Sequence, residues 1–318
     1  MFNTINGGKT ETACFDIIVF AEMVMKQLKD LLGDGYSISV SENRKNNGIT
    51  PVGLSISSNS ERPDAGAIIY LEGYLGSYNE GDMDIMEICD DIIKVFHENM
   101  RDFDFDTGSI SSFDQVKDRI CCKLVNAEMN SDKIYMLPHR KFRDLAIIYY
   151  IPLQVNGYNA SITITPNLLE LWGVDEADLY DAAMNNNTEY CILSIAEVMK
   201  DAAAELGLNG ADSFFAAPPH MGPEMYVATN KAREFGATFL MQKNRLKEFS
   251  DRINDDFYIL PSSVHELLFI PATGMYASSL SEMVKDVNAN LLDKEEILSN
   301  SVYRYYRDLN KVIVECYG

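Results

Sequence analysis

The residues nearest to a catalytic set are Ser262, Ser263, His265 and Glu266, which lie within five positions. They would supply a hydrolase with a nucleophile, a base and a carboxylate that orients the base. In an extended chain, however, Ser263 and His265 are about 7 Å apart, outside hydrogen-bonding reach. No Gly-x-Ser-x-Gly elbow surrounds the serines, and no second histidine follows at the helical zinc spacing. A local turn held by side-chain-to-backbone bonds is the competing interpretation, and it explains the serines more simply.

Two further motifs resemble ligand loops but lack required residues. The run 7–10, Gly-Gly-Lys-Thr, matches the end of a phosphate-binding loop, but Asn3 stands where that loop needs glycine and no strand precedes it. Asp102, Asp104 and Asp106 alternate as in a calcium loop, yet the later glycine and the bidentate glutamate are missing. We therefore predict no metal and no cofactor.

The cysteines and apolar runs indicate the compartment. No two cysteines have C-x-x-C spacing, so zinc and thioredoxin-like sites are not expected. No apolar run approaches the roughly 20 residues that span a bilayer, and the first twelve residues lack the apolar core of a signal peptide. We predict a cytoplasmic protein with reduced thiols and no membrane association. The thiols are Cys14, Cys89, Cys121, Cys122, Cys191 and Cys316.

The chain is strongly acidic, with 27 Lys and Arg against 48 Asp and Glu in 318 residues, a net charge of -21. Residues 72–106 hold 11 acidic and 2 basic residues, and residues 144–230 hold 12 acidic and 1 basic. Such concentration predicts acidic faces that repel nucleic acid and attract basic proteins. A solvated surface without a specific partner is the alternative. The predicted partner-binding residues are Glu80, Asp82, Asp84, Asp102, Asp104, Asp106, Asp175, Glu176 and Asp178.

Residues 107–143 are the exception, with 7 basic and 4 acidic residues. The block ends in Pro-His-Arg-Lys-Phe-Arg at positions 138–143. Such a basic run either docks on the protein's own acidic surface or binds an anion. The candidate anion-binding residues are Arg119, His139, Arg140 and Lys141.

Hydrophobic periodicity predicts helices mixed with hairpins. Asp82 is the expected N-cap of the helix at 83–100, and a capping box at Ser112 and Gln115 predicts a helix to about residue 130. The predicted helices are 12–32, 83–100, 112–130, 166–172, 175–184, 194–206, 244–253 and 279–290. The predicted strands are 36–40, 49–56, 67–71, 145–153, 160–165, 225–229, 237–241, 257–260, 267–270, 302–307 and 311–316.

Connections that are mostly hairpins predict an α+β fold with largely antiparallel sheets and helices packed on them. The length allows two subdomains, which we expect at 1–135 and 136–318. The single tryptophan, Trp172, precedes Gly173 and is expected in the core or at a helix end.

Several sequence blocks, taken in order, resemble one family. They are Lys45-Asn46-Asn47-Gly48, Ile69-Tyr70-Leu71-Glu72, Val116-Lys117-Asp118-Arg119-Ile120, Leu171-Trp172-Gly173-Val174, Met225-Tyr226-Val227 with Thr229-Asn230, Tyr258-Ile259-Leu260-Pro261-Ser262-Ser263-Val264-His265-Glu266, and Met283-Val284 with Val287-Asn288. The chain resembles, over residues 36–306, the bacterial family of unknown function DUF5688. The resemblance implies a cytosolic protein of gut anaerobes, often encoded near mobile elements, and it carries over no catalytic residue.

Two functions follow as hypotheses. The first is a non-enzymatic, cytosolic interaction protein that binds a basic protein partner through acidic faces, in its sharper form a mobile-element inhibitor of a nucleic-acid-binding host protein. It requires the carboxylates to form an exposed face rather than to pair with the protein's own basic residues. The alternative is a hydrolase around the 261–266 segment, which requires a pocket that holds His265 beside a second titratable side chain.

Overall fold

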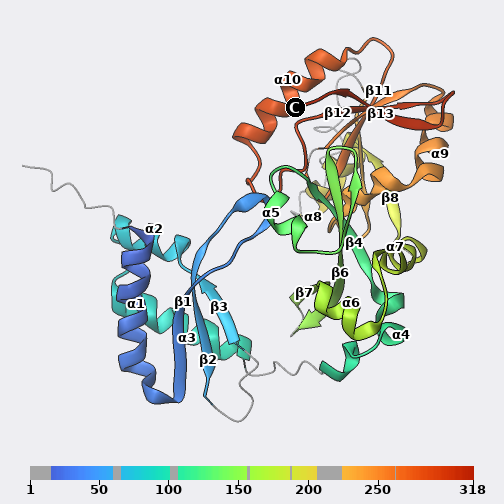
Figure 1. Ribbon diagram of the computed structural model, residues 1–318. Helices are drawn as coiled ribbons and strands as arrows, with labels where there is room; N and C mark the ends of the chain where they lie inside the picture. The colour runs from blue at the N-terminus through green and yellow to red at the C-terminus, as the bar shows by residue number, and fades with distance from the viewer. Residues whose placement is uncertain are drawn as a thin grey trace, which may run out of the picture. The chain divides into compact units, whose positions relative to one another are not determined.

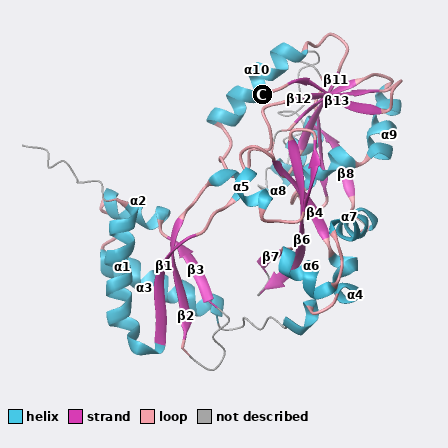
Figure 2. Cartoon of the chain, viewed as in Figure 1, coloured by secondary structure: helices cyan, strands magenta, loops and turns pink. Residues whose placement is uncertain are grey.

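The computed structural model describes residues 16–59, 66–100, 107–155, 158–186, 188–205, 224–261 and 263–318. The chain divides into two compact units. The first unit comprises Met1–Lys45, Ile49–Phe105 and Val155–Tyr158, and the second comprises Asn46–Gly48, Asp106–Gln154 and Asn159–Gly318. The fold is α+β with three antiparallel sheets in the described residues, as the hairpin pattern predicts (Figures 1 and 2). The expected boundary at 135/136 falls inside the second unit, where strands from both sides of it pair with each other.

The first unit is a three-stranded sheet with helices packed on it (Figure 1). The strand order is β1-β2-β3, and α1 contacts β1 and β2 while α3 contacts β3. The elements are α1 (Ile17–Leu32), η1 (Gly33–Gly35), β1 (Tyr36–Glu42), η2 (Asn46–Gly48, assigned to the second unit), β2 (Val52–Ser58), β3 (Gly66–Tyr70), α2 (Glu72–Glu80) and α3 (Ile85–Met100).

Alternation of apolar and polar residues explains this unit. Ile38 pairs with Ile56, and both are buried, whereas Ser39 and Ser55 pair one residue along and lie on the other side of the sheet. The helix α1 buries Phe20, Ala21, Val24 and Leu28 toward the same core. Hydrophobic periodicity is therefore sufficient to predict the core of this unit.

The start of α3 differs from the prediction. The N-cap is Asp84, not Asp82, because the helix begins at Ile85. Asp84 Oδ1 accepts the amides of Met86 and Glu87 at 2.8 and 2.9 Å, and Glu87 Oε2 accepts the Asp84 amide at 2.9 Å. The short helix α2, which Gly81 caps with φ of 81°, packs Tyr74, Leu75 and Tyr78 against the core and was not predicted.

The second unit contains two sheets. The four-stranded sheet has the order β4-β6-β5, with β7 also paired to β6, and the six-stranded sheet has the order β13-β12-β10-β11-β9-β8. The strands are β4 (Cys121–Asn126), β5 (His139–Phe142), β6 (Leu145–Val155), β7 (Tyr158–Thr163), β8 (Tyr190–Ser194), β9 (Tyr226–Asn230), β10 (Phe257–Leu260), β11 (Leu267–Pro271), β12 (Val302–Tyr306) and β13 (Lys311–Cys316). The helices are η3 (Thr107–Ile110), α4 (Phe113–Val116), η4 (Lys117–Arg119), α5 (Ser131–Tyr135), α6 (Pro166–Trp172), α7 (Glu176–Asn185), α8 (Ile195–Glu205), η6 (Gly236–Met241), α9 (Lys243–Ile253) and α10 (Ala277–Asn290).

Two predicted elements of this unit are wrong. The helix expected at 112–130 is one turn, α4, followed by η4 and then β4, which pairs with β6 in register from Cys121↔Tyr150 to Asn126↔Leu145. The capping box is present, but the sheet partner overrides helical continuation. The strand expected at 237–241 is the buried 3₁₀ helix η6.

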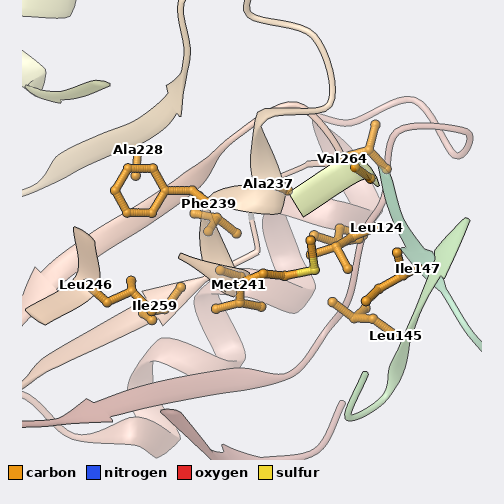
Figure 3. Close-up of a cluster of buried hydrophobic side chains, with 14 of the residues drawn as sticks. Leu124, Leu145, Ile147, Ala228, Ala237, Phe239, Met241, Leu246, Ile259 and Val264 are labelled. Carbon is orange, nitrogen blue, oxygen red and sulfur yellow. The ribbon is translucent and has the colours of Figure 1, made fainter. Parts of the chain in front are cut away.

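The largest core lies between the two sheets of the second unit. Leu124, Leu145 and Ile147 come from the four-stranded sheet, and Ala228 and Ile259 come from the six-stranded one. Figure 3 shows these side chains with Phe239 and Met241 of η6, all within one buried cluster. The 3₁₀ helix thus joins the two sheets into one core.

None of the helices in the described residues combines the length and the apolar composition that a membrane-spanning helix needs.

Candidate functional site

The acidic stretch of the first unit is exposed. Residues 72–98 contain eight carboxylates and one lysine, Lys94. Glu80, Asp82 and Asp84 are all exposed at the junction of α2 and α3. Asp84 also caps α3, where its charge favours the positive end of the helix dipole. Asp102, Asp104 and Asp106 lie outside the described residues.

Within this stretch Asp91 is bonded to a tyrosine. Tyr74 donates its hydroxyl to Asp91 at 2.7 Å, and burial together with that bond raises the pKa of Tyr74 to about 12. Met86 is 45% exposed between the capping residues and Asp90. The junction and the outer side of α3 therefore present carboxylates around one apolar side chain.

The acidic block of the second unit is used internally instead. Asp175 caps α7 by accepting the amides of Ala177 and Asp178, and Asp178 Oδ2 accepts the Asp175 amide. Glu176 pairs with Arg140 at 2.9 Å. Two further carboxylates of this block face basic residues, in the pairs Glu189–Lys231 at 3.2 Å and Asp201–Arg233 at 4.0 Å. Three carboxylates of this block thus lie beside basic residues of the second unit.

The structure brings one predicted anion-binding residue to one predicted partner-binding residue. Arg140 binds Glu176 through Nε and Nη2 and lies 3.8 Å from the Tyr180 ring centroid. Tyr149 donates its hydroxyl to the same carboxylate, and burial followed by this bond raises the pKa of Tyr149. The basic run therefore docks, through Arg140, on the protein's own acidic residue.

The other basic candidates do not join Arg140. His139 and Lys141 are its neighbours on β5 and so lie on the opposite side of the strand. His139 Nδ1 bonds to the carbonyl of Leu137 at 2.9 Å. Arg119 is exposed on η4 and donates to the carbonyl of Pro152 at 3.4 Å.

The 261–266 segment is a turn bonded to backbone. Ser262 lies outside the described residues. Ser263 is buried, and its hydroxyl accepts the amide of His265 at 3.0 Å. His265 Nδ1 accepts the amide of Phe235 at 3.2 Å, and the two rings stack at 5.5 Å. An imidazole that accepts at Nδ1 carries its proton on Nε2, so His265 is not placed as a base toward Ser263.

Glu266 gives the segment no triad either. It is half-buried, and its backbone carbonyl accepts the Ser263 amide at 3.3 Å. The carbonyl of His265 accepts the Thr229 hydroxyl at 2.8 Å. These bonds tie the turn to β9, which is a positioning role rather than a nucleophile–base arrangement.

A cavity of about 560 Å³ lies beside this turn, in the second unit. The N-terminal end of β4, β6, the end of α7, β8 and the segment from the end of β9 through η6 supply its walls. A second cavity of about 550 Å³ shares five wall residues with it: Tyr150, Pro152, Ala232, Glu234 and Phe235. The volume is in the range of small-molecule sites.

The wall residue Phe235 has an unusual backbone. Its φ is 51°, and that of Arg233 is 54°, a left-handed region that costs a non-glycine residue about 1 kcal/mol. The bond from its amide to His265 and the edge-to-face contact with Tyr150 at 5.2 Å hold Phe235 there. Lys123 Nζ lies 4.3 Å from the Phe235 ring centroid and 5.7 Å from that of Tyr150. Sequence reasoning did not single out these residues, because they are distributed over three separate segments.

Burial between the aromatic rings lowers the pKa of Lys123 from 10.5 to about 8, with nearby Lys133 adding to the shift. Since the folded pKa is below the unfolded one, the unfolded chain binds more protons between these values and stability rises with pH. We expect wild type to gain about 2–3 kcal/mol relative to Lys123→Met between pH 7 and pH 10. Urea unfolding of both proteins at each pH measures this gain.

The comparison with Lys123→Met is essential because cysteines and tyrosines also titrate in this range. Their contribution is common to both proteins and cancels in the difference. A difference in unfolding free energy that stays constant from pH 7 to pH 10 would show that the Lys123 ammonium is not desolvated.

The two thiols of the wall are poor nucleophiles. Burial raises the pKa of Cys122 to about 12 and raises that of Cys121 as well. Among the described residues, no three His, Cys, Asp or Glu side chains come together as a metal site requires. Neither wall thiol is therefore poised as a nucleophile.

The comparisons give a family without an activity. The model of a family described as "Family of unknown function (DUF5688)" matches residues 17–307, most of the chain, and confirms the resemblance seen in the sequence blocks. No curated protein and no solved structure is significantly similar to the chain.

Proposed function

The chain belongs to the DUF5688 family, whose description assigns no activity, and from its own surface we propose a non-enzymatic interaction protein that binds a basic protein partner. The observation that carries the proposal is the exposed acidic stretch at 72–98 of the first unit. Its carboxylates lie on α2, on α3 and on the turn between these helices, and Lys94 is the single lysine among them. The negative electrostatic potential of such a surface attracts basic proteins and raises the rate at which they associate with it.

The second unit contributes less to this surface. Glu176 is paired with Arg140, and Asp175 and Asp178 cap α7. These carboxylates stabilise the fold, and a partner would have to compete with the bonds they already make. The proposal therefore places the partner on the α2–α3 junction and α3, not on the α7 segment.

The test is a pull-down with a triple variant. Glu80→Gln, Asp82→Asn and Asp90→Asn remove three exposed charges that make no helix cap. We expect wild type to retain a stoichiometric basic protein from a lysate of the source organism at about 0.05 M salt and to release it at about 0.5 M. The triple variant should retain at least tenfold less, as read by mass spectrometry.

The matched control is Glu282→Gln, Asp293→Asn and Asp308→Asn, which makes the same charge change at exposed positions of the second unit. This control should retain the partner as wild type does. If both triple variants lose the same amount of partner, the interaction depends only on the net charge of the protein. That result would contradict binding at the α2–α3 junction and α3. If no basic protein is retained at the low salt concentration and released at the high one, the proposal itself is contradicted.

The sharper form of the proposal is inhibition of a nucleic-acid-binding protein. A helix rises about 1.5 Å per residue, so α3 carries its carboxylates along roughly 20 Å. A basic groove that accepts phosphates at close spacing would accept such a row. Labelled duplex DNA added to the isolated complex should then displace the chain in proportion to its concentration. Simultaneous binding of DNA and chain would refute this form while leaving the interaction itself intact.

A further inference from the structure

The cavity of about 560 Å³ in the second unit has several polar wall residues whose donors are already used within the protein. Tyr190 donates to Thr238 Oγ1 at 3.1 Å, and Thr238 donates in turn to the carbonyl of Phe235 at 2.9 Å. Asn186 uses Nδ2 toward the carbonyls of Ile120 and Lys117. These donors are therefore engaged within the protein, and the amide oxygen is the remaining polar atom of Asn186.

Two carboxylates add negative charge to that wall. Glu234 is exposed, and its backbone is fixed by Asn230, whose Oδ1 accepts the Glu234 amide at 3.2 Å and whose Nδ2 donates to the Glu234 carbonyl at 2.6 Å. Glu189 pairs with Lys231, but both side chains are more than 70% exposed, so this pair exchanges readily with solvent or with another cation.

The remaining wall is aromatic and apolar. Tyr150 and Tyr190 contribute rings, and Met184 and Met241 contribute flexible apolar side chains. Lys123 offsets part of the charge of Glu234, but it is not part of the wall of either described cavity. A ligand that complements these walls carries hydrogen-bond donors and positive charge on a flat or apolar body.

We propose that the cavity bounded by Tyr150, Tyr190, Glu189 and Glu234 binds a cationic amine or guanidinium group attached to a planar or apolar body. The charged group lies between the two carboxylates, and the body lies against the tyrosine rings. This inference does not rest on the acidic stretch of the first unit, because every wall residue belongs to the second unit. The cation comes either from a free small amine or from an arginine or lysine side chain of a protein.

Three probes of one shape test the charge requirement on the full chain. Benzamidine is cationic, benzamide is its neutral counterpart, and benzoate is anionic. Calorimetric titration should give saturable binding of benzamidine, with benzamide and benzoate at least tenfold weaker. Glu234→Gln should weaken benzamidine at least tenfold, and Glu189→Gln should weaken it by a smaller factor. Glu80→Gln, in the first unit, is the matched control and should leave the affinity unchanged.

A capped glycine-arginine-glycine peptide identifies the source of the cation. Binding of benzamidine without the peptide indicates a free small amine as the source, whereas binding of both indicates an arginine side chain of a protein, and both results support the proposed chemistry. Three results would overturn it: no saturable binding of either cation, equal binding of benzamide, or affinities unchanged in both glutamate variants. Unaltered Trp172 fluorescence establishes that the second unit is folded in the Glu189→Gln and Glu234→Gln variants, because Trp172 lies in that unit.

Discussion

Replacing Asp144 by alanine is expected to lower the unfolding free energy of the second unit by about 3–5 kcal/mol. The carboxylate of Asp144 accepts three hydroxyl hydrogen bonds, from Ser299 at 2.6 Å, Ser301 at 2.9 Å and Tyr303 at 2.7 Å. All three donor residues are at most 2% exposed. Alanine would leave buried hydroxyls without the charged acceptor that now pairs them, and this cost exceeds that of losing one surface bond.

Urea unfolding followed by the fluorescence of Trp172 measures this cost, because the single tryptophan reports on the second unit. Tyr303→Phe removes one of the three donors and should cost about 1–2 kcal/mol. Asp293→Asn, at an exposed position of the same unit, should change stability by less than about 0.5 kcal/mol. If Asp144→Ala behaved like Asp293→Asn, the three hydroxyls would have to find other acceptors, and the network assignment would fail.

Asp144 also shows what composition cannot predict. It belongs to the most acidic block of the chain, yet its partners lie 155 to 159 residues away. The same holds for Glu176, whose partner Arg140 lies 36 residues earlier. Counting charges predicts how acidic a segment is, but only the fold decides which carboxylates are paired and which remain exposed.

Local hydrophobic periodicity predicted those helices and strands in which buried residues recur at the helical or the strand period. The stripe of α1 and the alternation of β1 and β2 are of this kind, since each has one buried side. The segment 112–130 failed because its helix-start signal is real but short, and β4 is stabilised by pairing with β6. The signal that favours a strand there lies in a different part of the sequence.

The cavity was beyond sequence reasoning for the same reason. Its wall residues come from β4, β6, the end of α7, the start of β8 and the segment from the end of β9 through η6, which have no common motif. One local signal existed, the single glycine in the run Arg-Glu-Phe-Gly at 233–236. Without the structure this glycine indicates only a turn, whereas the fold shows that the backbone of two other segments passes directly beside it.

Gly236 is the position where one added methyl group is expected to cost most. A Cβ there would lie 2.5 Å from the carbonyl oxygen of His265 and 2.8 Å from the amide nitrogen of Asn230, and it would also overlap Thr229 Oγ1. Two of these three atoms are backbone and cannot rotate away. We expect Gly236→Ala to destabilise the second unit by about 3–5 kcal/mol, above the usual range for overpacking, because β9 and the 263–266 turn must separate.

Gly274→Ala is the control that separates crowding from backbone conformation. Gly274 has φ of 80° but nothing within 4 Å of an added Cβ, so alanine there should cost about 1 kcal/mol through the left-handed backbone alone. Adding Thr229→Ala to Gly236→Ala should recover only part of the loss, since the backbone atoms of His265 and Asn230 remain. A Gly236→Ala cost no larger than that of Gly274→Ala, in the same urea titration, would mean that the turn and β9 are free to move apart. In that case the wall segment with Glu234 and Phe235 would also adjust to the added methyl group. The affinity of Gly236→Ala for benzamidine should then be close to that of wild type.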